Sequence, residues 1–427
     1  MKKKREINQR AKQHPSLKAI NPSMLALKKV RLPEQELRKL IQLNKQKNEH
    51  TPLAFNYFLL ATHYMENNNY SAAIENLQHC LKIRKTHGDK KEIVLTMFML
   101  SELARRVHDY ALSEKLCLEL LCIYKDDLDN EKLYLVNLSL GFNYAALGSM
   151  ENARLYYQEC LDLCRQTNDI LGMAESQEYL AKVEIEMGNF LRAIEYLDSA
   201  YKNYEVEDDI NGVVTVQSLI GDAHAGLGNY EQAKKYYEKS MKTVQKMKDN
   251  HATILALYGL GLVALDENEY DLAKQYFLTC QAITEKYDDT LGNLLAHEAL
   301  AYIEFLNGDY NAQFAILFTS HNFIDLQADP EGLVLFLEGL ALCTLKLNMP
   351  QHGYVFWGSA TQLRAIKPHK KPFQKRISYS QFAPAPEILA DPENIESYQL
   401  GLSGNSSKIA DVIHSIMSGD TLKTDIF

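Results

Sequence analysis

The stretch LGNYEQAKKYYEKS, residues 227 to 240, places a glycine, aromatic residues and a small residue at fixed distances from one another. Its key positions are Gly228, Tyr230, Ala233 and Tyr237, and related residues return every forty positions. The position of Tyr230 gives the series Tyr70, Tyr110, Met150, Phe190, Tyr230, Tyr270, Tyr310 and Pro350. A constant step over so many copies indicates an internal repeat, which has to be recognised before single elements are assigned.

Further series keep the same step of forty residues. Small residues that follow Leu or Ile form the first of them: Ala61, Ser101, Gly141, Ala181, Gly221, Gly261, Ala301 and Ala341. The position of Ala233 gives Ala73, Ser113, Ala153, Ala193, Ala233, Ala273, Gln313 and Gly353. The position of Tyr237 gives Leu77, Cys117, Tyr157, Leu197, Tyr237, Phe277, Leu317 and Trp357. Small residues let two helices approach closely while a bulky residue fills the groove, so each repeat is predicted to be a helix pair and the fold all-α.

The expected helix ends carry their own signals. Glycine fits the left-handed conformation that closes many helices, and it stands at the predicted ends Gly148, Gly188, Gly228 and Gly308. Between repeats runs an aspartate series: Asp89, Asp129, Asp169, Asp209, Asp249, Asp289 and Asp329. We interpret these aspartates as caps of the following helix and not as catalytic carboxylates. Pro330 then stands in a first helical turn, where proline is tolerated.

Together these positions resemble the tetratricopeptide repeat over roughly residues 54 to 366. The forty-residue length exceeds the usual period of about 34 and is similar to the long repeats of kinesin light chains and bacterial peptide-sensing regulators. The resemblance implies a right-handed superhelical solenoid of about eight helix-turn-helix repeats. Three positions depart from the pattern: His108 where glycine is expected, Gln313 in a small-residue position and Pro350 in place of the aromatic.

Charge divides the chain into a basic start and an acidic remainder. Residues 1 to 50 hold 14 Lys/Arg against 4 Asp/Glu, a balance of +10, and the remaining residues hold 32 against 51, a balance of −19. We expect a basic flexible arm over 1–32, a capping helix over 33–50, the repeat array over 51–367, and a C-terminal basic, proline-rich segment with a short capping helix over 368–427. The arm is interpreted as a solvated tail that could shield the acidic array.

The segment after the array offers one more comparison. FWGSATQLRAIK, residues 356 to 367, resembles the end of helical-repeat sensor regions in bacterial signalling ATPases. The residues that match are Trp357, Gly358, Ala360, Leu363 and Arg364. A short terminal helix is expected near Lys408 to Met417.

The sequence shows no pattern typical of catalysis, of a bound cofactor or of a metal site. No phosphate-binding loop or His-Glu-x-x-His motif occurs, and the seven cysteines include no Cys-x-x-Cys pair. We therefore predict no enzyme activity, no cofactor and no metal, and interpret the cysteines as small buried residues in a reducing compartment. No apolar run is long enough to span a membrane, so a cytoplasmic location is expected. Nucleic acid is an improbable partner, because no aromatics alternate with the basic residues.

The family pattern implies that the first helix of each repeat lines a concave wall. Carried onto this chain, it assigns these candidate partner-binding residues to the wall: Glu175, Glu178, Asp222, Tyr258, Glu298, Tyr302 and Phe305. The first hypothesis is a non-catalytic protein-protein interaction scaffold or adaptor, which binds a basic or amphipathic protein segment in an acidic, aromatic-bearing groove. The alternative is a peptide- or ligand-responsive regulatory sensor whose superhelix changes conformation on binding.

Overall fold

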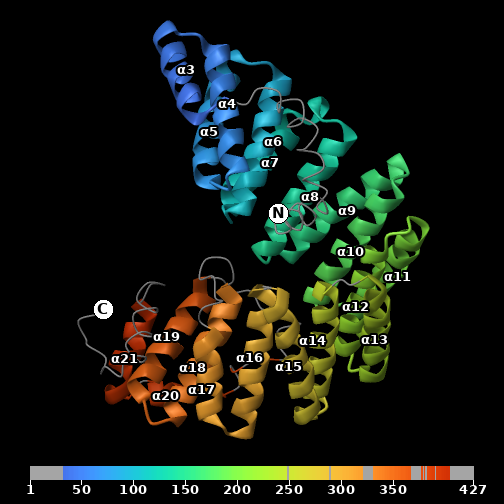
Figure 1. Ribbon diagram of the computed structural model, residues 1–427, viewed down its shortest axis with the longest axis vertical. Coiled ribbons are helices and arrows are strands. Elements are labelled where there is room, and N and C mark those ends of the chain that lie inside the picture. The colour runs from blue at the N-terminus through green and yellow to red at the C-terminus, as the bar shows by residue number, and fades with distance from the viewer. Residues whose placement is uncertain are drawn as a thin grey trace. The chain divides into compact units, whose positions relative to one another are not determined.

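The computed structural model describes residues 32–247, 250–287, 290–320, 330–366, 377, 379, 382–389 and 391–403. These residues form α-helices and one short 3-10 helix, η1 (Lys125–Asp127), and no strand occurs among them (Figure 1). The chain divides into two compact units, Met1–Ser176 and Gln177–Phe427, with the boundary inside helix α10 (Ile170–Glu186). The all-α prediction is confirmed, whereas the predicted arm and the helix expected near 408–417 lie outside the described residues.

The described part of unit 1 contains a single helix that is followed by helix pairs. Its helices are α3 (Glu34–Lys47), α4 (His50–Glu66), α5 (Tyr70–His87), α6 (Lys90–Arg106), α7 (Tyr110–Ile123), α8 (Asn130–Ala146) and α9 (Met150–Thr167). Each helix packs against the next one along the chain, and α6 also contacts α8. Consecutive elements are therefore neighbours in space, as in a solenoid.

Unit 2 continues the same alternation. Its helices are α11 (Phe190–Val206), α12 (Ile210–Gly226), α13 (Tyr230–Met247), α14 (Asn250–Asp266), α15 (Tyr270–Tyr287), α16 (Thr290–Asn307), α17 (Tyr310–Ser320), α18 (Pro330–Lys346), α19 (Pro350–Ile366), α20 (Pro386–Leu389) and α21 (Pro392–Ser403). Figure 1 shows them in chain order beside one another. The first helices of the pairs also contact one another in succession, α12 with α14, α14 with α16 and α16 with α18. We call these four helices the first-helix layer.

The turn inside every repeat has one residue in the left-handed conformation. Their φ values lie between 57° and 79°, and the residues are Asn68, His108, Gly148, Gly188, Gly228, Asn268, Gly308 and Asn348. The four glycine positions confirm the prediction, and asparagine, which tolerates this conformation, takes three of the others. His108 departs from the pattern in residue type but not in conformation, and its Nδ1 lies 2.8 Å from the hydroxyl of Tyr110.

The aspartates between repeats cap the helices that follow them. The carboxylates of Asp89, Asp129, Asp169 and Asp209 each accept a hydrogen bond from the backbone N–H three residues later. The capping interpretation is confirmed for these four, and the other three aspartates of the series lie outside the described residues. Pro330 begins α18, as expected for a first-turn proline.

The small and bulky series meet inside each repeat. A Cβ on Gly221 would lie 2.7 Å from Cε1 of Tyr237, and a Cβ on Gly261 would lie 2.5 Å from Cε1 of Phe277. Both aromatic side chains are fully buried. The second helix can approach the first only because the side chain at the small position is missing or minimal.

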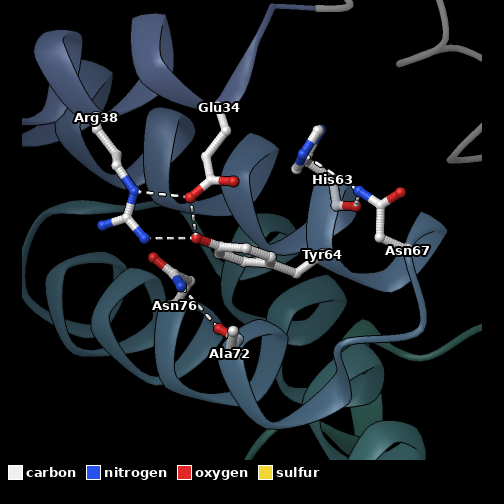
Figure 2. A network of polar contacts seen from close by, with 7 residues as sticks. All are labelled: Glu34, Arg38, His63, Tyr64, Asn67, Ala72 and Asn76. Carbon is white, nitrogen blue, oxygen red and sulfur yellow. Dashed lines mark hydrogen bonds and ion pairs between the residues drawn. The ribbon is translucent and has the colours of Figure 1, made fainter.

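Helix α3 is attached to α4 by a polar network (Figure 2). The Tyr64 hydroxyl donates to Oε1 of Glu34 at 2.6 Å, and Arg38 donates to both of them. The bond from Tyr64 and then that from Arg38 lower the pKa of the Glu34 carboxyl. A lowered pKa means that the carboxylate stabilises the docking of α3 at neutral pH, and that this contribution is lost as the pH falls through the lowered pKa. Of the residues predicted as a capping helix, 33–50, Glu34–Lys47 form α3.

Six of the seven cysteines are buried free thiols, as predicted. Burial raises the pKa of Cys80 to about 11 and that of Cys117 to about 12, which makes these thiols poor nucleophiles. The prediction is wrong for Cys122, which is exposed because it lies near the end of α7, one residue before the last.

The close helix contact predicts the result of overpacking it. Ala233 is fully buried on α13, so Ala233→Leu should lower the free energy of unfolding by about 1–3 kcal/mol. The control is Ala111→Leu, at an exposed position on α7, which should change it little. Chemical denaturation measures both, and equal stabilities would contradict the assigned packing.

The polar network predicts a local effect at α3. Tyr64→Phe removes the hydroxyl that links Glu34 and Arg38 of α3 to α4, so the backbone amides of α3 should exchange hydrogen faster than in the unmodified chain. Tyr287→Phe, at an exposed side chain of α15, is the control. Hydrogen exchange followed by mass spectrometry makes the measurement, and unchanged protection of α3 would show that the network does not hold the helix.

Candidate functional site

Glu175 is the one predicted site residue that belongs to unit 1. Its side chain is half-buried, and Oε2 accepts a hydrogen bond from the hydroxyl of Tyr134 at 3.3 Å. The carboxylate therefore has a structural partner on α8.

Glu178, the first predicted residue of unit 2, is largely buried on α10. Oε2 accepts a hydrogen bond from the hydroxyl of Tyr204 at 2.8 Å, and Oε1 accepts one from Nζ of Lys182 at 2.6 Å. Lys182 lies one turn later on the same helix, so the two charges balance locally. Glu178 therefore attracts a cationic ligand less strongly than the sequence analysis predicts for an acidic wall residue.

Asp222 lies on α12 of the first-helix layer and is half-buried. Its Oδ1 accepts a hydrogen bond from the hydroxyl of Tyr237 at 2.6 Å. The ring of Tyr237 is the bulky group that packs against Gly221, so the carboxylate fixes the polar end of a core side chain. One acidic position thus combines a structural bond with a partly accessible charge.

Three predicted residues, Glu298, Tyr302 and Phe305, share one face of α16. Spacings of four and three residues place them on successive turns of the same helix face. Their side chains are only 4%, 6% and 8% exposed. The structure therefore brings these three residues together, and another part of the chain covers them.

The covering residues come from the segment between α19 and α20. The ring of Tyr379 meets those of Tyr302 and Phe305 edge to face, each with centroids 5.3 Å apart. The ring of Phe382 meets Phe305 in the same way at 4.8 Å. Edge-to-face contacts of this kind stabilise aromatic pairs beyond the area they bury. The sequence analysis missed these contacts, although two aromatic residues inside a proline-rich stretch were a signal.

Gln313 explains why repeat seven departs from the pattern. Its side chain is fully buried, and Nε2 donates to the backbone carbonyl of Gly339 at 3.2 Å and to the hydroxyl of Tyr379 at 3.3 Å. Burial raises the pKa of Tyr379 well above its ordinary value, so the phenol stays neutral at physiological pH. An alanine at position 313 could make neither bond.

Tyr258 borders this aromatic group from α14. Its ring is half-buried and lies 5.4 Å from that of Phe277, and it packs against the same hydrophobic cluster as Tyr302. On α18, Glu338 is buried and accepts a hydrogen bond from Nε of Arg364 at 2.8 Å. The surroundings of Tyr302 therefore combine aromatic rings with carboxylates, at least one of which has a cationic partner.

The described residues offer no alternative centre for metal chemistry. No group of three or more potential ligands among His, Cys, Asp and Glu occurs within the part of the chain that the structure describes. The helices in that part also include none that is long and apolar enough to cross a membrane.

Comparison with protein families identifies the repeats. The tetratricopeptide repeat model matches residues 133–205 and 212–286, and the SHNi-TPR model matches residues 57–91. These parts of the chain are thus tetratricopeptide repeats, as the forty-residue series predicts. A search of curated proteins gives no match.

The chain is also similar to solved structures. Aspartyl phosphate phosphatase F from Bacillus subtilis is 17% identical, with a TM-score of 0.53 over 76% of this chain and 89% of that one. NprR in complex with its cognate peptide NprX is 14% identical, with a TM-score of 0.51 over 81% and 97%. A signal transduction ATPase with a tetratricopeptide repeat sensor from Pyrococcus horikoshii reaches a TM-score of 0.48 at 14% identity, over 68% and 47%. The first two likenesses show the solenoid fold alone, and the resemblance of residues 356 to 367 to ATPase sensor regions stays a prediction.

The bonds of Gln313 predict an outcome opposite to that expected from the repeat pattern. Gln313→Ala restores the alanine of the repeat, yet it leaves the Tyr379 hydroxyl and the Gly339 carbonyl without this donor. We expect the free energy of unfolding to fall by about 1–3 kcal/mol. Gln275→Ala, at an exposed position of α15, is the control for chemical denaturation. A stability equal to or above that of the unmodified chain would contradict the role given to Gln313.

Proposed function

We propose that this chain is a non-catalytic adaptor whose first-helix layer binds a protein segment. The observation that carries the proposal is the irregular segment at Tyr379 and Phe382, which lies against the α16 face through aromatic contacts. A helix face that holds one non-helical segment of polypeptide has the chemistry to hold another. NprR, which shares the fold, was solved in complex with a cognate peptide, and this supports a peptide as the class of ligand.

The proposed ligand is basic or amphipathic. Residues 51–427 carry a balance of −19, and Asp222 presents a half-buried carboxylate on the first-helix layer. Charges of this kind speed the encounter with a cationic segment, while aromatic residues such as Tyr258 hold it after binding. Because Glu178 is paired with Lys182, we give Asp222 the larger part in attracting the ligand.

The proposal includes the location and the division of the chain. Buried free thiols suit a reducing compartment, so we place the protein in the cytoplasm. The array over 51–367 would carry the binding surface, with the arm over 1–32, the cap over 33–50 and the segment over 368–427 outside it.

A peptide-responsive regulator is the second candidate function. It is favoured by the same segment at Tyr379, because a ligand that reaches Tyr302 and Phe305 has to displace it. A ligand that prefers the displaced state would shift the equilibrium between the two states.

The binding test uses a phage library of random twelve-residue peptides selected on the immobilised full chain. We expect the recovered peptides to be rich in Lys and Arg alternating with hydrophobic residues. Asp222→Asn, which keeps an acceptor for Tyr237, should slow association and flatten its dependence on salt. Tyr258→Ala should mainly speed dissociation, at a cost of about 1–3 kcal/mol in binding free energy.

The matched control is Glu195→Gln, at an exposed side chain on the second helix α11. It removes one negative charge from unit 2 without touching the first-helix layer, so association should stay close to that of the unmodified chain. Peptides without basic enrichment, or equal effects of the Asp222 and Glu195 variants, would contradict the proposed surface.

A further inference from the structure

The segment that covers α16 has the features of a bound peptide. Ile377, Tyr379 and Phe382 belong to no α-helix, yet Ile377 and Tyr379 are only 4% and 1% exposed. Phe382 remains 40% exposed, although its ring contacts Phe305. Two side chains are therefore inserted, and a third lies at the rim, three residues after Tyr379.

The site around Tyr379 is built from residues that differ from the other repeats. Gln313 stands where five other repeats have alanine, and its amide reaches the tyrosine hydroxyl. Gly339 leaves room for the ring, because a Cβ there would lie 3.0 Å from Cε2 of Tyr379. The positions forty and eighty residues before Gly339 are also small, Ala299 and Gly259. The corresponding positions before Gln313 hold alanine, so the buried amide is particular to this site. The amide donor of Gln313 and the space at Gly339 together make a site that fits the phenol ring of a tyrosine.

The segment can leave α16 without releasing the end of the chain. Helix α21 packs closely on α19, where a Cβ on Gly401 would lie 2.1 Å from the carbonyl oxygen of Val355. The hydroxyl of Ser359 also donates to the carbonyl of Gly401 at 3.2 Å. The segment that carries Tyr379 is thus held on both sides by helices that contact each other directly.

We propose that Tyr302, Phe305, Gln313 and Gly339 form a tyrosine-binding site, which the chain's own Tyr379 fills. The site accepts in its place a peptide with Tyr and Phe three residues apart in a turn, as in the resident segment, where the N–H of Phe382 donates to the carbonyl of Tyr379 at 2.9 Å. This inference rests on the proposed function and specifies one site of its surface. The bound ring packs against Tyr302 and Phe305, and its hydroxyl accepts the hydrogen bond from Gln313. The second aromatic residue of the peptide packs on Phe305.

The chemistry of the site makes it selective for unmodified tyrosine. A phenylalanine in the same place would leave the buried amide of Gln313 without this acceptor, which weakens binding. A phosphotyrosine would bring a double negative charge into an apolar site that also contains the buried Glu298. Both changes should therefore reduce binding, and phosphate more than the loss of the hydroxyl.

The resident segment competes strongly with any free peptide. Because a short tether holds the resident segment near the site, its effective concentration is in the millimolar range. A free peptide with the same contacts is present at a lower concentration in most measurements, so it displaces little of the resident segment. Replacing Tyr379 should remove this competition and open the site.

The experiment uses a fluorescein-labelled peptide of residues 375–384, KRISYSQFAP, and follows its polarisation on titration with the full chain. The Tyr379→Ala variant should bind the peptide at least about tenfold more tightly than the unmodified chain. Adding Gln313→Ala to that variant should reverse most of the gain. A peptide with phenylalanine in place of the tyrosine should bind the Tyr379→Ala variant more weakly than the original peptide. A peptide with phosphotyrosine should bind it most weakly of the three.

A second variant keeps the test decisive if Tyr379→Ala does not fold. Phe382→Ser changes a partly exposed side chain and should raise the affinity for the labelled peptide severalfold, whereas Ile388→Ser, at an exposed residue of α20, should not. Circular dichroism confirms folding of each variant.

Equal affinity of the Phe382→Ser variant and the unmodified chain would overturn the inference, as would equal affinity of a folded Tyr379→Ala variant. If library peptides bind but the labelled segment does not, this inference alone fails; if neither binds, the proposed function fails as well.

Discussion

Close contact between a small residue on the first helix and a bulky residue on the second is the constraint on which the structure depends. At Gly221 and Gly261 there is no room for a Cβ beside the rings of Tyr237 and Phe277. Because this contact recurs every forty residues, it fixes the spacing of the helix pairs and the faces they present. The positions available for binding, such as Asp222 and Tyr258, follow from that register.

Local features of the fold were predictable because each depends on residues within one repeat. The turn residues, the aspartate caps and the small positions need only the chain within about forty residues of them. The position of Tyr379 was not predictable in this way, since its contact with Gln313 joins residues 66 positions apart and lies outside the period. Helix α21 escaped prediction for the same reason, because its packing depends on the distant Gly358.

The candidate surface differs from the sequence prediction in how its charges are used. Tyrosine hydroxyls donate to Glu175, Glu178 and Asp222, and Lys182 balances one of these charges. The acidic residues therefore stabilise the helix pairs, and they also contribute to the negative surface potential. Around α16 the aromatic contacts outweigh charge, because Glu298, Tyr302 and Phe305 are buried under the chain's own segment. Binding and displacement are thus linked at this face.

Photo-crosslinking tests the central claim, that the first-helix layer holds the ligand, most directly. A library-selected peptide with a benzophenone in place of one hydrophobic residue would be irradiated with the full chain, and the attached residues identified by mass spectrometry. The account predicts attachment to α14, α16 or α18, with attachment to α16 increased in the Tyr379→Ala variant. Attachment mainly to the second helices α13, α15 and α17 would contradict it.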